Sequence, residues 1–92
     1  MTWPADRPAF IRAQLTAALS PVRLEIADES QHHAGHPGAQ AGGHYRVTIV
    51  SPAFTGLSLV QRHRLIYQAI GDLATHGIHA LAIASAATPD ET

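Results

Sequence analysis

The sequence predicts an α+β domain in which a helix, two strands, a second helix and a third strand follow one another. Three patterns indicate this order. Residues 44–51 alternate apolar and polar side chains, residues 59–74 repeat apolar side chains every three or four positions, and residues 78–83 alternate again. Because a helix joins the last two strands, we expect them to pair in parallel, in a three-stranded mixed sheet with both helices on one face.

The first half of the chain supplies one helix and one strand. Residues 1–8 are expected to be a flexible lead-in, because Pro4 and Pro8 disfavour regular structure, and the folded domain then runs over residues 9–84. The first helix carries apolar residues at helical spacing: Phe10, Ile11, Leu15, Ala18 and Leu19. It ends near Pro21, and residues 22–28 form the first strand. That strand directs its apolar residues toward the helices: Val22, Leu24 and Ile26.

The second half supplies the centre of the fold. The strand over residues 44–51 is expected to bury its apolar residues: Tyr45, Val47 and Ile49. Residues 51–56 form a turn with an extra short helical turn, in which Phe54 fills the core beneath the long helix. Ser58 is the expected N-cap of that helix and Gly77 follows its end. In the last strand, three residues should share one face: His79, Leu81 and Ile83. Residues 85–92 are expected to be a flexible tail.

Composition narrows the function classes. The chain has six arginines, no lysine and seven acidic residues, which is not the strongly basic balance of a nonspecific DNA-binding protein. It contains no cysteine, so disulfides and thiolate chemistry of its own are excluded. No apolar run approaches the ~20 residues of a membrane span, and the first residues resemble neither a signal peptide nor a transit peptide. We therefore expect a soluble, cytoplasmic protein.

Histidine is over-represented, with seven residues. Parallel pairing of the last two strands would place His79 near His44. Three histidines lie in the connection between the first two strands, and one follows the long helix, so six are expected at one end of the molecule: His32, His33, His36, His44, His76 and His79. Only His63 is expected at the other end. Two or three converging imidazoles suit Fe, Zn, Cu or Ni. The alternative is a solvated loop, with His76 favoured as a cation at a helix C-terminus and His79 half-buried with its hydrogen bonds satisfied.

Five motifs in order resemble those of the BolA family. They are Asp28-Glu29-Ser30 followed by His33, His44-Tyr45-Arg46-Val47 leading to Val50-Ser51, Phe54-x-Gly56, Arg62-His63-Arg64-Leu65-Ile66-Tyr67, and His79-Ala80-Leu81-Ala82. The resemblance covers about residues 11–83. It implies an αββαβ fold related to the class II KH fold.

The resemblance also implies a cofactor and a partner. BolA-like proteins pair with monothiol glutaredoxins, and the two can share a 2Fe-2S cluster. The glutaredoxin side supplies a cysteine and a glutathione thiolate, and the motifs carry the other two ligands over to His79 and His33. The connection is slightly longer than is usual in the family, so three further histidines remain less favoured candidates: His32, His36 and His44.

The Arg62-His63-Arg64 stretch permits two interpretations. In the first, His63 is a buried core residue and the arginines cover the sheet edge or pair with Asp28 or Glu29. In the second, Arg62 and Arg64 contact DNA, because BolA-like proteins include reported DNA-binding regulators. A KH domain, however, clamps the nucleic-acid backbone with a G-x-x-G loop, and here Gly56 stands alone.

Three functions therefore remain open. The favoured one is a nonenzymatic iron–sulfur accessory or iron-homeostasis regulator that forms a heterodimer with glutaredoxin, its free form being a monomer or a weak homodimer. The second is a DNA-binding transcriptional regulator. The third is an enzyme or a mononuclear metal carrier, although no set of nucleophile, base and orienting residue is evident.

Overall fold

The computed structural model describes residues 7–29, 43–73, 75 and 77–92. Its helices and strands follow the predicted order, with two short 3₁₀ helices in addition. They are α1 (Arg7–Leu19), β1 (Arg23–Asp28), β2 (Gly43–Val50), η3 (Pro52–Phe54), α2 (Leu59–Ile70), β3 (Ile78–Ala87) and η5 (Pro89–Glu91). The predicted α+β class is confirmed, and η3 is the short helical turn expected after the central strand.

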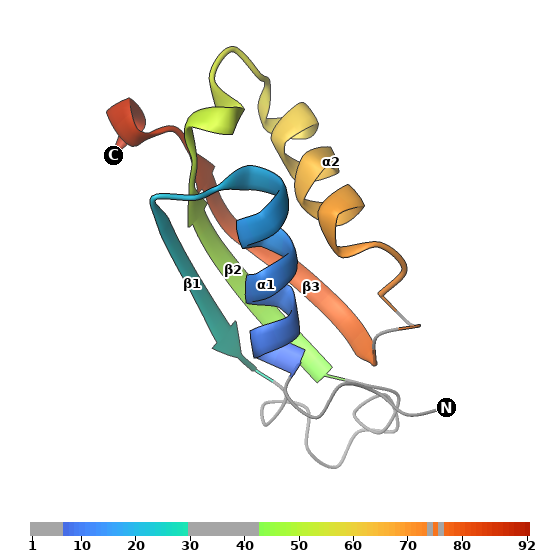
Figure 1. Cartoon of the computed structure of the whole chain (residues 1–92). Helices are drawn as coiled ribbons and strands as arrows, with labels where there is room; N and C mark the ends of the chain where they lie inside the picture. Colours follow the sequence, from blue (N-terminus) through green and yellow to red (C-terminus); the bar gives the residue numbers. More distant parts are fainter. Residues whose placement is uncertain (1–6, 30–42, 74, 76) are drawn as a thin grey trace.

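The three strands form one mixed sheet in the order β1-β2-β3. β1 pairs antiparallel with β2, and β3 pairs parallel with β2. Both helices lie on the same face of this sheet, as Figure 1 shows. Because β2 and β3 are parallel, they begin at the same end of the molecule, while α2 begins at the opposite end (Figure 1). The predicted topology is therefore confirmed.

The core lies between the helices and the sheet face that they cover. Tyr45, Val47 and Ile49 of β2 are buried, as their alternation predicted. Phe54 is fully buried in the same cluster, which confirms its expected place beneath α2. Since these odd-numbered side chains of β2 face the helices, the even-numbered side chains lie on the uncovered face of the sheet.

α2 begins where predicted but ends earlier. Ser58 caps its N-terminus through a capping box, in which Ser58 Oγ accepts from the Gln61 amide and Gln61 Oε1 accepts from the Ser58 amide. The helix ends at Ile70 because Gly71 takes φ 85° and ψ −151°, a conformation open to glycine but not to a helix. The predicted extension to Ala74, ending before Gly77, is therefore wrong.

The buried side of α2 coincides only in part with the apolar repeat over residues 59–74. Leu59 is 64% exposed, whereas Arg62, Ile66 and Ile70 face inward at a spacing of four. His63 is half-buried rather than part of the core. A charged residue can occupy the inward stripe because its hydrogen bonds are satisfied, as described below.

Two boundaries in the first half of the chain differ from those predicted. α1 includes Arg7 and Pro8, which the prediction assigned to the lead-in; proline in the first helical turn loses no hydrogen bond. Val22 precedes β1 and is 65% exposed, so it does not belong to the inward stripe of that strand.

The largest difference is at the C-terminus, where β3 continues to Ala87 and η5 follows. Residues 85–92 were predicted as a flexible tail, but Ala86 and Thr88 are buried, and the Ser51 amide donates to Ala87 O at 2.9 Å. Alanine is a weak strand former, so local composition gives little sign of this strand; pairing with β2 extends it. Among the helices in the described ranges, none combines the length and apolar character needed to cross a membrane.

Candidate functional site

The candidate site is formed where β2 and β3 begin, by His44 and His79; we call this pair the histidine rim. Gly43 pairs with Ile78 and His44 pairs with Ala80, so His79 is an extra residue in β3, a β-bulge. A bulge redirects a side chain. Here Ile78 and Leu81 are both buried, three residues apart, while His79 between them is exposed.

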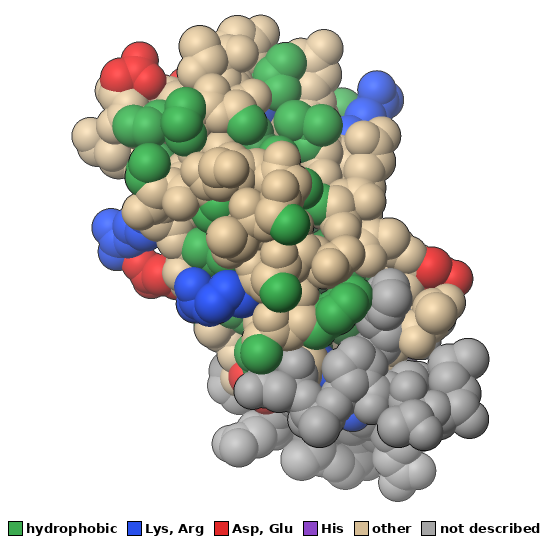
Figure 2. Space-filling view, viewed as in Figure 1, with side chains coloured by type: hydrophobic (Ala, Val, Ile, Leu, Met, Phe, Trp, Pro, Cys, Tyr) green, Lys and Arg blue, Asp and Glu red, His purple; other side chains and the backbone are tan. Residues whose placement is uncertain are grey.

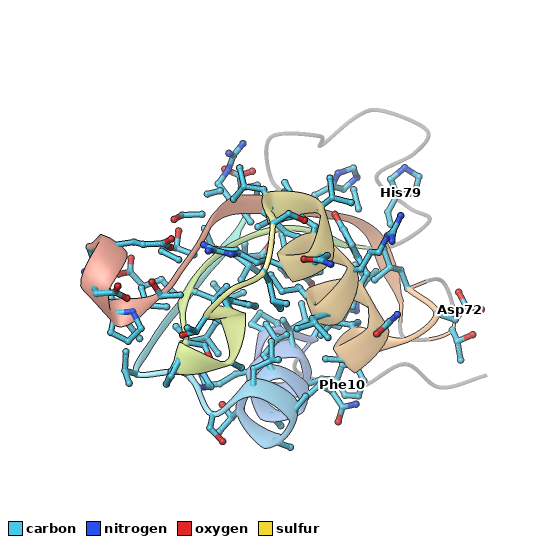
Figure 3. All side chains as sticks on the ribbon, turned by 90° about the horizontal axis from the view of Figure 1, so that it is seen from above. Phe10, Asp72 and His79 are labelled. Carbon is cyan, nitrogen blue, oxygen red and sulfur yellow. The ribbon has the colours of Figure 1, made fainter. Side chains whose placement is uncertain are left out.

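The bulge corrects one prediction and leaves another intact. His79 does not share a face with Leu81 and is not half-buried, because the extra residue breaks the alternation. The prediction that His79 lies beside His44 is confirmed, since their ring centroids are 4.7 Å apart and the rings are tilted by 43°. In Figure 3, His79 lies on the sheet side of the molecule and Phe10 on the helix side.

The two imidazoles differ in exposure. His44 is half-buried, and its Nε2 atom is buried, whereas His79 is exposed. A ligand arriving from solvent would therefore meet His79 first, with His44 behind it.

The other histidines divide into two groups. His32, His33, His36 and His76 lie outside the described residues. His63 belongs to α2, which begins at the opposite end from the rim (Figure 1). Within the ranges that the structure describes, no group of three or more His, Cys, Asp or Glu side chains could hold a metal ion. The rim alone thus offers two nitrogen ligands.

Backbone hydrogen bonds hold the start of β2 in place. The Gly43 amide donates to Gly77 O at 3.0 Å, and the Glu29 amide donates to His44 O at 2.7 Å. The rim is therefore fixed on both sides, by the end of β1 and by the turn before β3.

Packing at Gly43 adds a constraint that the sequence analysis missed. A Cβ atom on Gly43 would lie 2.5 Å from Cζ of Tyr45, so the Tyr45 ring covers the glycine Cα. The sequence does contain a sign of this packing, namely a glycine two positions before an aromatic residue in a strand. The aromatic ring can fold over such a glycine on the same face of the sheet.

Beside His44 on the uncovered face, Arg46 forms an ion pair with Glu29, with Nε 3.2 Å from Oε2. Glu29 was an expected partner of the arginines in α2, but it pairs with Arg46 instead. This pair balances the cation next to the rim.

Arg62 has a structural role, as the first interpretation expected, because it covers the edge of the sheet at the end of β3. Its side chain is buried, its Nε donates to Leu57 O at 3.0 Å, and its Nη1 donates to Ala86 O at 3.0 Å. It also binds both carboxylate oxygens of Glu91, at 2.6 and 3.0 Å. The expected pairing with Asp28 or Glu29 is therefore wrong for Arg62. The DNA-binding interpretation also loses this residue, because its donors are already used; Arg64 remains exposed.

The Arg62–Glu91 pair changes the acidity of the carboxyl group. The hydrogen bond from Arg62, followed by the one from the Thr88 amide, lowers the pKa of Glu91 from 4.5 to about 2. The same contact with Glu91 raises the pKa of Arg62. Glu91 was assigned to a flexible tail, so its role could be found only from the fold.

Comparison with known proteins agrees with this architecture. A family model described as BolA-like protein matches residues 15–91. Over 81 residues the chain is 48% identical to BolA-like protein 1 of Homo sapiens, covering 88% of this chain and 57% of that protein. It is 46% identical over 92 residues to SufE-like protein 1, chloroplastic/mitochondrial, of Arabidopsis thaliana, covering 94% of this chain. The chain spans 24% of SufE-like protein 1, and so only part of these curated relatives.

Solved structures show the same fold. The BolA domain of SufE1 from Arabidopsis thaliana has a TM-score of 0.81 and 47% identity, with 97% of this chain and 99% of that chain covered. The solution structure of BolA1 from Mus musculus has a TM-score of 0.74 and 42% identity, with 99% and 72% covered. This chain belongs to the BolA family.

Proposed function

We propose that this chain is a nonenzymatic accessory protein that pairs with a monothiol glutaredoxin and shares a 2Fe-2S cluster with it. Its work would lie in iron–sulfur cluster trafficking or iron homeostasis, in the cytoplasm. His79 and His33 are the proposed ligands from this chain, and a cysteine and a glutathione thiolate are those from the partner side.

The observation that carries the proposal is the exposed His79 at the rim of the sheet. It stands beside a second imidazole, 4.7 Å away between ring centroids. The connection that contains His33 leaves the described chain at Glu29 and rejoins it at Gly43, and both of these residues flank His44. Both ends of the connection that contains His33 therefore lie at the rim.

The donor set also fits an iron–sulfur cluster shared between two chains. With no cysteine in the sequence, this chain can offer imidazole nitrogen but no thiolate, and the two proposed ligands, His79 and His33, leave the remaining positions to a partner's thiolates. Two imidazoles in place of two thiolates on one iron raise the reduction potential, as in Rieske centres. This chain would contribute by holding His79 exposed at the bulge in β3. From there the imidazole could reach across the interface with the glutaredoxin.

Coexpression with a monothiol glutaredoxin tests this function. We expect a heterodimer whose visible absorption differs from that of the glutaredoxin homodimer, and we expect His79→Ala to change that spectrum. His63→Ala is the matched control, because His63 lies on α2, away from the rim. Failure to form a heterodimer would contradict the pairing. Identical spectra in His79→Ala, His33→Ala and the unmodified complex would contradict the ligand assignment.

A further inference from the structure

We propose that His44 and His79 form a site of their own for one divalent late first-row metal ion, with Cu²⁺ bound most tightly. This site shares His79 with the proposed cluster but differs from it, because it uses His44, needs no partner, and would bind an ion rather than a cluster. The ion and the cluster would therefore be alternative occupants of His79. Three observations support it: the distance between the rings, their placement by β pairing, and the chemistry around them.

The distance between the rings suits one bound ion. A metal–nitrogen bond of about 2.0–2.1 Å puts two imidazole centroids on one ion roughly 4.5–5 Å apart. The observed separation is 4.7 Å, and the tilt of 43° excludes a parallel stack. Both rings carry nitrogen lone pairs when neutral, which an apolar aromatic pair does not.

The backbone already holds the two ligands together. His44 is fixed by the β1–β2 and β2–β3 pairings, and the bulge fixes His79 opposite it. Little conformational freedom is therefore lost when an ion binds, which favours affinity. An ion can enter from solvent because His79 is exposed.

The surroundings are compatible with added positive charge. The neighbouring cation on the uncovered face, Arg46, is paired with Glu29. Imidazole ligands select the later first-row ions, with affinity increasing toward Cu²⁺. Two protein ligands leave further positions for water, so the site would exchange its ion readily.

The test must remove the histidines outside the rim. In a variant with His32, His33, His36 and His76 all changed to Ala, three histidines remain: His44, His63 and His79. Titration of this variant with Cu²⁺ against a competing amino acid should show one ion bound per chain. Electron paramagnetic resonance of the 1:1 sample should show coupling to two imidazole nitrogens.

Single changes in that background decide the assignment. His44→Ala and His79→Ala should each weaken Cu²⁺ binding at least tenfold, and His63→Ala should leave it unchanged. His44→Gln, which keeps more side-chain volume, replaces His44→Ala if circular dichroism shows that the alanine variant is unfolded. Unchanged affinity in either rim variant, or an equal loss in His63→Ala, would overturn the proposal.

A further comparison separates this site from the shared cluster. In the otherwise unmodified chain, His44→Ala should remove the Cu²⁺ site but leave the spectrum of the glutaredoxin complex intact, whereas His33→Ala should do the reverse. Cu²⁺ binding at the rim without any glutaredoxin pairing would contradict the proposed function alone. Pairing without Cu²⁺ binding at the rim would contradict this inference alone.

Discussion

Among single side chains, the buried Arg62 guanidinium joins three parts of the fold. It contacts the turn before α2 at Leu57, the end of β3 at Ala86, and η5 at Glu91. Arginine can bond to all three acceptors because its planar guanidinium group carries several donors in fixed directions. Arginine at this position is therefore explained by packing and hydrogen bonding rather than by contact with a ligand.

The first prediction compares Arg62→Lys with Arg64→Lys. A lysine at position 62 keeps the charge but cannot make the two parallel bonds to Glu91 and also reach Leu57 O and Ala86 O. We expect the melting temperature to fall by several degrees in Arg62→Lys and to stay nearly unchanged in Arg64→Lys, whose side chain is exposed. Thermal unfolding followed by circular dichroism measures both; equal melting temperatures would contradict the structural role.

The second prediction concerns Gly43. An alanine there would meet the Tyr45 ring, which is only 4% exposed and has little space to move. We expect Gly43→Ala to lower the free energy of unfolding by about 1–3 kcal/mol, the usual cost of overpacking. Urea unfolding of Gly43→Ala, Tyr45→Val and the double variant forms a double-mutant cycle. The alanine should cost much less once the ring is gone, and strict additivity would show that the ring is not the obstacle.

Between secondary-structure elements, α2 protects the outer edge of β3. Tyr67 Oη donates to Leu81 O at 2.6 Å, and Arg62 donates to Ala86 O. Both carbonyl groups belong to an edge strand, and an uncovered edge strand invites pairing with other chains. The helix therefore packs on the sheet and also occupies backbone groups that another strand would use.

The third prediction concerns η5, which the Arg62–Glu91 pair ties to α2. Because the pKa of Glu91 is lowered to about 2 in the folded protein, its carboxylate stabilises the fold above the unfolded value of 4.5. That contribution is lost as the pH falls from about 5 toward 2. The stability difference between the unmodified chain and Glu91→Gln should therefore be constant at neutral pH and shrink across this range.

Urea unfolding at pH 7, 4 and 3 measures this difference. Glu25→Gln is the control, because Glu25 is exposed and pairs with Arg23 on the surface, where an ion pair contributes little. A Glu91→Gln difference that is the same at pH 7 and pH 3 would contradict the proposed linkage.

For the protein as a whole, the topology could be predicted from the sequence because the spacing of apolar side chains shows which of them face the core. The alternation of Tyr45, Val47 and Ile49 and the crossover through α2 were sufficient for the parallel pairing. The ends of the elements were not predictable in the same way. Gly71 stops α2 through its backbone conformation, and β3 continues over alanines because β2 is there to pair with them.

The candidate site was predictable in part for the same reason. Parallel strands joined by a helix begin at one end of a sheet, so the sequence alone predicts that His79 lies beside His44. The bulge that turns His79 outward has no local sequence signature, and the Glu91 partner of Arg62 lies 29 positions away. Features that depend on register or on distant contacts therefore needed the structure.

The most direct measurement uses this chain labelled with ¹⁵N-histidine, in complex with an unlabelled monothiol glutaredoxin. Pulsed electron paramagnetic resonance of the reduced complex would detect nitrogen bound to iron. We predict that the nitrogen couplings change from ¹⁴N to ¹⁵N values on labelling and that His79→Ala removes one of them. Couplings that do not respond to the label would contradict the account, because no histidine of this chain would then be a ligand of the shared cluster.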